Sequence, residues 1–305
     1  MTIEDPHAEN PHATSILPAE VAATTSTPKR SHRSALAMFR NPGIAFGTAI
    51  TLIWLVVMLT VHWWAPYDPY ESVGSRLQAP NGQHWFGTDA LGRDVFTRVL
   101  YGSRQSLPIA VAVIASALLI GGTLGALAGY FGKFTDTAVM RLADVTMAFP
   151  AILLAMAVAA ALGPGLRNGF IAMVIVWWPI YARLLRAQVM AVKHREHIEA
   201  AVSVGATQGR ILRRHVLPLS FTGVMVNATM DLGQVVLLTA SLSFLGLGAV
   251  PPAPEWGAMI TEGAKNFYQW WIAVAPGLAI ATVVLGFNFL GDGLRDALDV
   301  RSASR

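Results

Sequence analysis

Long uninterrupted stretches of apolar residues recur along this chain of 305 residues. A helix that crosses the hydrocarbon core of a bilayer needs about 20 mainly apolar residues. The segments that meet this requirement are Ile44–Ala65, Leu107–Tyr130, Val139–Leu162, Phe170–Arg186, Phe221–Leu245 and Trp271–Leu290. Because these runs are continuously apolar and do not alternate, they predict an all-α membrane protein with six transmembrane helices rather than membrane-spanning β-strands.

The composition supports this class. Hydrophobic residues make up 54% of the chain and charged residues 13%, whereas a soluble domain carries about 25% charged residues. The chain contains no cysteine, which excludes disulfides, thiolate metal sites and a cysteine nucleophile in this sequence.

The polar start of the chain differs from the rest. Residues 1–34 are rich in Thr, Ser, Pro, Ala and His and show no apolar period, so we expect a disordered cytoplasmic tail before a membrane domain at 35–305. A cleavable signal peptide is not expected, because the first apolar run begins only at Ile44.

Lysine and arginine near the ends of the predicted spans indicate their direction. Basic residues precede the first span, fill the loop between the fourth and fifth spans, and follow the sixth: Lys29, Arg30, Arg33, Arg40, Arg183, Arg186, Lys193, Arg195, Arg210, Arg213, Arg214, Arg295 and Arg301. These positions predict a multi-pass protein of the plasma (inner) membrane with both termini in the cytoplasm. Arg76, Arg93, Arg98 and Arg104 on the opposite side weaken the asymmetry.

This direction places two loops outside, at 66–105 and 246–270, and one large loop inside, at 190–218. Aromatic residues, which prefer the membrane–water interface, gather beside the outer loops: Trp63, Trp64, Tyr67, Tyr70, Phe267, Tyr268, Trp270 and Trp271.

The inner loop is predicted to contain two short helices separated at Gly205, which can adopt a left-handed conformation at little cost. Thr207 is a candidate cap for the second helix, which we expect to stop at or before Leu217 because Pro218 follows. A helical hairpin of this kind suits docking into a groove of another protein. The alternative is an amphipathic hairpin that binds lipid headgroups.

The spacing within this loop is restrictive. Glu199, Ala200 and Ala201 are followed by Gly205, Ile211, His215 and Pro218. This pattern resembles the EAA loop of the membrane subunits of ABC importers, where the loop is the socket for a cytoplasmic ATPase. The resemblance implies that these seven residues couple the chain to an ATPase on another chain.

Further segments resemble the C-type permeases of dipeptide, oligopeptide and nickel importers. They are His84–Arg98, Tyr101–Leu107, Asp136–Pro150, Trp178–Arg183, Ser241–Gly248, Pro254–Met259 and Leu290–Asp296. The resemblance covers Ser31 to Arg301 in order and implies a type I ABC importer permease fold that forms half of a path for di- or oligopeptides. Nickel or another small solute stays open as the cargo.

The same resemblance implies the partners. They are a homologous B-type permease, two cytoplasmic ABC ATPases, an extracytoplasmic substrate-binding protein and membrane lipid, with no nucleic acid. ATP and Mg would be bound by the ATPases, because Gly129–Lys133 lacks the glycine spacing of a Walker A loop. No catalytic residue, metal site or cofactor is expected in this chain; the pair His194 and His197 is better explained as solvated cytoplasmic residues.

The outer segment from Asp68 to Arg104 is a candidate docking surface for the binding protein, with a lid folded on its own subunit as the equal alternative. The candidate docking residues are Asp89, Arg93, Asp94, Arg98, Glu255 and Trp256.

Polar residues within the predicted spans have separate interpretations. Asn227, Asp231 and Gln234 share one helix face and are predicted to line the translocation path, where they would meet the amino terminus or backbone of a peptide. The alternative is a polar patch that bonds to neighbouring helices. Arg141 and Asp144 are expected to form an ion pair along one helix.

Gly121, Gly125 and Gly129 form a small-residue stripe that is expected to allow close helix packing.

Two other classes of function compete. An ion-driven secondary transporter would need substrate and ion sites within one chain, often with inverted repeats, and no convincing repeat is found. An intramembrane enzyme would need a nucleophile or metal set within the spans, and no such motif is present.

Overall fold

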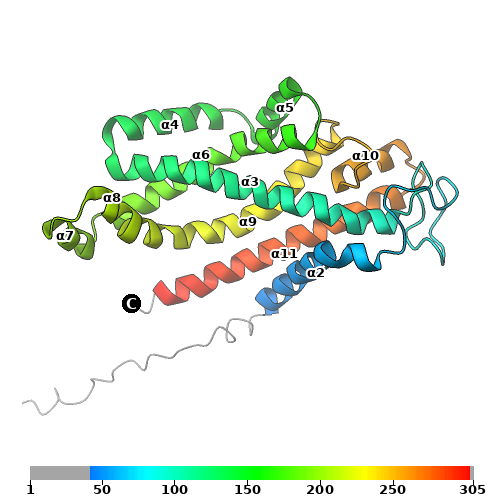
Figure 1. Ribbon diagram of the computed structural model, residues 1–305, viewed down its shortest axis with the longest axis horizontal. Coiled ribbons are helices and arrows are strands. Elements are labelled where there is room, and N and C mark those ends of the chain that lie inside the picture. Colours follow the sequence, from blue (N-terminus) through cyan, green and yellow to red (C-terminus); the bar gives the residue numbers. More distant parts are fainter. Residues whose placement is uncertain (1–41, 303–305) are drawn as a thin grey trace, which may run out of the picture.

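A computed structural model describes residues 42–302, apart from the side chains of Thr222 and of residues 297–302. These residues form a bundle of long helices (Figure 1). The elements are α2 (Pro42–Trp64), α3 (Val95–Phe131), α4 (Lys133–Met147), α5 (Ala151–Leu162), α6 (Leu166–Val192), α7 (Glu196–Ser203), α8 (Gln208–Ile211), η1 (Leu212–Val216), α9 (Leu217–Phe244), α10 (Trp256–Lys265) and α11 (Trp271–Ser302). The predicted tail at 1–34 lies outside the described residues.

Five of the described helices are long and apolar enough to cross a membrane: α2, α3, α6, α9 and α11. The predicted third span, Val139–Leu162, is wrong as a single helix. Its residues lie in α4 and α5, whose axes differ by 89°. Pro150 stands between the two helices with a non-helical backbone, at φ −55° and ψ 131°. A proline has no N–H to continue a helix and disfavours helical geometry in the residue before it. The pair is a broken span or a re-entrant segment.

The predicted outer loops also change. Helix α3 begins at Val95, because the carboxylate of Asp94 caps it by accepting the backbone N–H of Thr97 at 2.7 Å. The predicted outer loop 66–105 is therefore shorter, and we call the observed segment 65–94 the outer cap. The second predicted outer loop, 246–270, contains the helix α10, which the apolar pattern did not predict.

The glycine stripe holds α3 against α6. A Cβ atom at Gly121 would collide with the carbonyl oxygen of Trp178, and one at Gly125 would collide with that of Ala182. At Gly129 the Cβ would lie 2.8 Å from the carbonyl oxygen of Arg186. The predicted packing role is confirmed, because three turns of α3 lie directly on the α6 backbone.

The two ends of the bundle differ. Figure 1 shows α7 and α8 at one end, and the outer cap with α10 at the other. Helices α2 and α11 lie side by side; α2 begins, and α11 ends, on the side that faces α7. This arrangement places one helical hairpin and the two described chain ends toward the same face.

Candidate functional site

Helix α7 is anchored along one side and free along the other. Ile198 is 2% exposed and belongs to the main hydrophobic core, whereas Val202 and Val204 are 57% and 88% exposed. Glu196 and Glu199 lie in the first helical turn, where negative side chains interact favourably with the helix dipole. The side that is free in this chain therefore combines the exposed Glu199 and Ala200 with two apolar side chains.

Gly205 ends α7 in the predicted way. Its φ is +84°, and no atom lies within 4 Å of where its Cβ would be. The N–H of Ala206 donates to the carbonyl oxygen of Ala201 at 3.1 Å, which closes the turn. The predicted left-handed turn is confirmed, since a residue with a Cβ is strained at this φ even where space is available.

The second half of the hairpin differs from the prediction. Thr207 stands before α8 with an extended backbone, but its side chain makes no capping hydrogen bond. The expected stop at Leu217 is wrong, because α8 continues through the π-helical turn η1 into α9, with Pro218 in the first turn of α9. The wider hydrogen-bond pattern of a π turn accommodates a residue without an N–H. The hairpin and the membrane-spanning helix α9 are thus joined without a loop.

The seven predicted coupling residues occupy different depths. Glu199, Ala200, Gly205 and Pro218 are exposed, Ala201 and His215 are half-buried, and Ile211 is buried. Ile211 packs in the main hydrophobic core, so it holds the hairpin against the body instead of facing a partner. Val202 and Val204 were not among the predicted residues, and only their exposure in the fold identifies them.

The outer cap is held by a buried charge network. Arg93 binds Asp89 at 2.6 Å (Nε to Oδ2) and Glu262 of α10 at 3.2 Å (Nη2 to Oε2). Arg98 lies 3.4 Å from Asp89 through its Nε and donates from Nη1 to the carbonyl oxygen of Pro69 at 2.8 Å. The network connects the cap, the start of α3 and α10.

Glu262 was missed in the sequence, because nothing near it on the chain marks it as a partner of residues 169 positions earlier. Burial, followed by repulsion from Asp89, raises the pKa of the Glu262 carboxyl, and Arg93 and Arg98 oppose this rise.

The two remaining acidic candidates are helix caps. Asp94 caps α3 and also lies 2.9 Å from Nδ1 of His84. Glu255 caps α10 by accepting the N–H groups of Gly257 and Ala258 at 3.0 and 2.9 Å, and burial raises the pKa of its carboxyl. Trp256 is fully buried and donates its indole N–H to the carbonyl oxygen of Val99 at 2.8 Å.

The prediction that six residues form the docking surface is therefore corrected, because the structure buries all of them. Each side chain takes part in a helix cap, an ion pair or core packing, and none is more than 3% exposed: Asp89, Arg93, Asp94, Arg98, Glu255 and Trp256. In this arrangement they cannot touch a binding protein directly, and they act on the surface by holding the cap in place.

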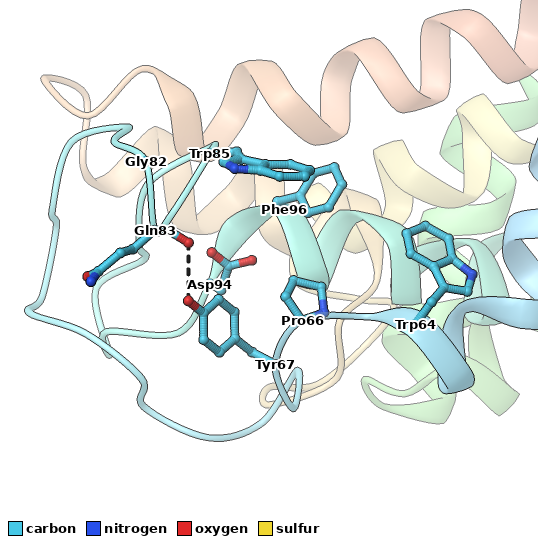
Figure 2. Close-up of a pocket in the computed structure, with 8 residues that line it drawn as sticks. All are labelled: Trp64, Pro66, Tyr67, Gly82, Gln83, Trp85, Asp94 and Phe96. Carbon is cyan, nitrogen blue, oxygen red and sulfur yellow. Dashed lines mark hydrogen bonds between the residues drawn. The ribbon is translucent and has the colours of Figure 1, made fainter.

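The surface around these residues is aromatic. A cavity of about 280 Å³ is lined by Trp64, Pro66, Tyr67, Gly82, Gln83, Trp85, Asp94 and Phe96. Figure 2 shows the Trp85 ring beside the Phe96 ring, and the Tyr67 hydroxyl bonded to the Gln83 carbonyl oxygen. The two ring centroids are 4.9 Å apart with the rings tilted by 56°, and the hydroxyl donates over 3.1 Å. Asp94 is the acidic side chain of this lining, and its carboxylate is already occupied by His84 and Thr97.

The predicted polar face lies midway along helix α9. Asn227 and Gln234 are exposed, and Asp231 between them is half-buried. The hydroxyl of Tyr181, a fully buried residue of α6, donates to Oδ2 of Asp231 at 2.8 Å. The structure thus brings the three predicted residues onto one face, and Tyr181 is an additional member that the sequence reasoning missed.

The predicted pair of Arg141 with Asp144 is wrong. Asp144 binds Arg183 of α6, and Asp136 binds Arg186 of the same helix. The fold prefers these partners because α4 lies alongside α6, so that two arginines on one helix meet two aspartates on the other. No ion pair of Arg141 is found within residues 42–302.

Comparisons with known proteins agree with this architecture. Residues 121–303 match the family model described as "Binding-protein-dependent transport system inner membrane component". The chain is 45% identical, over 86% of its length and of the relative's, to the dipeptide transport system permease protein DppC of Alkalihalophilus pseudofirmus. It is 40% identical to the probable D,D-dipeptide transport system permease protein DdpC of Escherichia coli K12, over 87% of this chain and 90% of the relative.

A third relative is the glutathione transport system permease protein GsiD of Escherichia coli O6:K15:H31, at 47% identity over 86% of this chain and 88% of the relative. Among solved structures, a chain of the inward-facing MetNI methionine ABC transporter superposes with a TM-score of 0.53 at 19% identity, covering 65% of this chain and 95% of that chain. This likeness supports the fold.

The candidate spans and the likeness to MetNI show a multi-pass membrane protein with the type I ABC importer permease fold. The chain belongs to the family of inner membrane components of binding-protein-dependent transport systems, within the C-type permeases of the dipeptide, oligopeptide and nickel branch. The predicted family and fold are confirmed, and the chain is a transmembrane subunit of an ABC importer.

Proposed function

We propose that this subunit transports di- or oligopeptides and that helix α7 couples it to the ATPases. The observation that carries the substrate class is the 45% identity with a dipeptide permease over 86% of both chains. Two further relatives are named as transporters of D,D-dipeptides and of glutathione, which are also short peptides.

The coupling surface consists of Glu199, Ala200, Val202 and Val204 on the free side of α7. An apolar patch beside a carboxylate suits insertion into a groove of an ATPase subunit. The chain is a non-catalytic subunit in this proposal: ATP and Mg are bound by two ATPase subunits, and this chain supplies the helix that docks on them. The side of α7 is then the cytoplasmic side, which gives the described chain ends the same location.

The path of force follows from the connection of the hairpin to α9. Because α8, η1 and α9 form one unbroken helical run, a displacement of α7 by the ATPases would move α9 with it. Rigid helices carry small shifts at one site over the length of the molecule. Helix α9 bears Asn227, Asp231 and Gln234, so the moving helix is also the one that lines the path.

The remaining partners complete the importer. A homologous B-type permease covers the polar face of α9, and the substrate passes between the two subunits. An extracytoplasmic binding protein delivers the peptide to the side of the outer cap. Its contact surface is the exposed cap and its aromatic residues, with the buried charge network beneath them.

The test is ATP-dependent uptake of a dipeptide by the complete importer in proteoliposomes. We expect uptake to require the binding protein, ATP and an intact α7. Glu199→Arg should lower both ATPase capture during purification and uptake, whereas Arg104→Ala, on the exposed outer part of α3, should change neither. Uptake without ATP that is unaffected by Glu199→Arg would show an ion-driven carrier instead.

A further inference from the structure

Asp231 is an acidic side chain within a membrane-spanning helix and is half-buried in this chain. Charged groups at this depth are costly and require a partner. The only hydrogen bond found for this carboxylate within the described residues comes from the neutral hydroxyl of Tyr181 at 2.8 Å. No Lys, Arg or His forms an ion pair with Asp231 in the same part of the chain.

The surroundings of the carboxylate are built to hold it in place. Tyr181 is completely buried, so its hydroxyl fixes Oδ2 from the α6 side. Trp177 lies one helical turn earlier, near the same carboxylate. Its indole N–H is buried and has no hydrogen-bond partner of normal geometry. Two aromatic side chains of α6 therefore lie at this carboxylate, and no hydrogen bond to its Oδ1 is found among the described residues.

The open face offers more acceptors. Asn227 stands four residues before Asp231 and Gln234 three residues after it, and both are exposed. Residues at this spacing share one side of a helix. Within residues 42–302, the Asn227 side chain makes one long bond of 3.4 Å, from Nδ2 to the Gly223 carbonyl oxygen, and its amide oxygen accepts none. The face thus carries one carboxylate and two side-chain amides.

This set of acceptors matches an ammonium group. A primary ammonium has three N–H donors and no acceptor, and hydrogen bonds between charged partners are the strongest of their kind. A dissociable cation also satisfies the carboxylate without a fixed partner, as a transport path requires.

We propose that Asp231, oriented by Tyr181, binds the protonated α-amino group of the peptide in transit, with Asn227 and Gln234 supplying the other acceptors. This inference rests on the proposed peptide function and names the chemical group that the site selects. Asp231 is a binding residue, and Tyr181 is a positioning residue that acts through it.

The test compares two cargoes that differ only in the ammonium: alanyl-alanine and propionyl-alanine, its des-amino analogue. Uptake of each is measured at saturating binding protein in proteoliposomes that contain the complete importer. All substitutions are in this chain, so the preference of the binding protein for one cargo over the other is the same in every experiment. This preference therefore cancels when the ratio of alanyl-alanine to propionyl-alanine uptake is compared between variants.

Asp231→Asn should lower the ratio of alanyl-alanine to propionyl-alanine uptake by about tenfold, the order expected for a lost charge-assisted bond. Asp231→Glu should retain most of the ratio, and Tyr181→Phe should lower it less than Asp231→Asn does. Thr229→Val, on the opposite side of α9, should leave the ratio unchanged.

Three results would overturn this inference and leave the proposed peptide function standing. The first is an unchanged ratio in Asp231→Asn while the wild type transports alanyl-alanine. The second is an equal fall for both cargoes. The third is loss of the partner permease from the purified Asp231→Asn complex, which would mean that the carboxylate binds a cation on that subunit. Absence of wild-type alanyl-alanine uptake would overturn the proposed peptide function and this inference with it.

Discussion

Arg93 of the outer cap forms an ion pair with Glu262 of α10, at 3.2 Å, across 169 positions of sequence. The same guanidinium binds Asp89 at 2.6 Å through Nε. One buried arginine therefore connects the cap to the helix that precedes α11, and the arrangement of the outer end depends on it.

Replacement of this arginine should destabilise the outer end. Arg93→Ala leaves the carboxylates of Asp89 and Glu262 without their shared partner, and removal of one member of a buried ion pair destabilises a protein by about 3–5 kcal/mol. We expect a lower melting temperature of the purified chain and faster proteolysis within the cap. Arg104→Ala is the matched control, because Arg104 is exposed and has no described ion pair. Equal stability of the two variants would contradict a structural role for the network.

The stability should also depend on pH through Glu262. Burial and repulsion from Asp89 raise the pKa of this carboxyl in the folded protein. The folded state then binds the proton more tightly than the unfolded state, so the contribution of Glu262 to stability falls as the pH rises from its ordinary pKa to its raised pKa. Glu262→Gln removes this slope. The melting temperature of Glu262→Gln minus that of the wild type should therefore increase as the pH rises between the ordinary and the raised pKa of Glu262. A series of thermal melts at different pH values measures this difference. A difference that does not change with pH would contradict the prediction.

Close packing of α3 on α6 should separate two neighbouring glycines. Gly125→Ala places a Cβ against the Ala182 carbonyl oxygen, whereas the Cβ of Gly122→Ala would meet Leu185 at 3.4 Å, an ordinary contact. We expect Gly125→Ala to reduce stability by about 1–3 kcal/mol, the usual cost of overpacking, and Gly122→Ala to be tolerated. The measurements are the yield of folded protein and the melting temperature in detergent. Similar behaviour of the two variants would mean that α3 and α6 can move apart.

The turn at Gly205 provides a second matched pair. Both Gly205 and Gly209 have open space where a Cβ would be, but only Gly205 has a positive φ, of +84°. Gly205→Ala should strain the turn by roughly 1–2 kcal/mol, tilt α7 and lower ATP-driven uptake together with ATPase capture. Gly209→Ala should behave like the wild type. Because steric contact is absent at both sites, a difference in uptake would report the backbone conformation alone, and no difference would indicate a hairpin that rearranges when the ATPase docks.

The presence of five membrane-spanning helices, the left-handed turn at Gly205 and the glycine stripe could be predicted from local rules, because each depends on residues that are near in sequence. The break in the third span could be predicted only in part from the sequence. Pro150 was visible, but the 89° bend between α4 and α5 depends on how both helices lie against α6. The continuation of α8 through a π turn into α9 overrode the local tendency of Pro218 to end a helix.

The sequence by itself determined the family, the membrane class and the acceptors on the α9 face, since these follow from hydrophobic length and from residue identity at helical spacing. Only the tertiary structure decided which charges are paired. Asp144 meets Arg183 instead of Arg141, Arg93 meets Glu262, and Asp231 meets Tyr181. The physical reason is that a charge or polar group is satisfied by whichever group packing brings within about 3 Å, and packing joins helices that lie far apart along the chain.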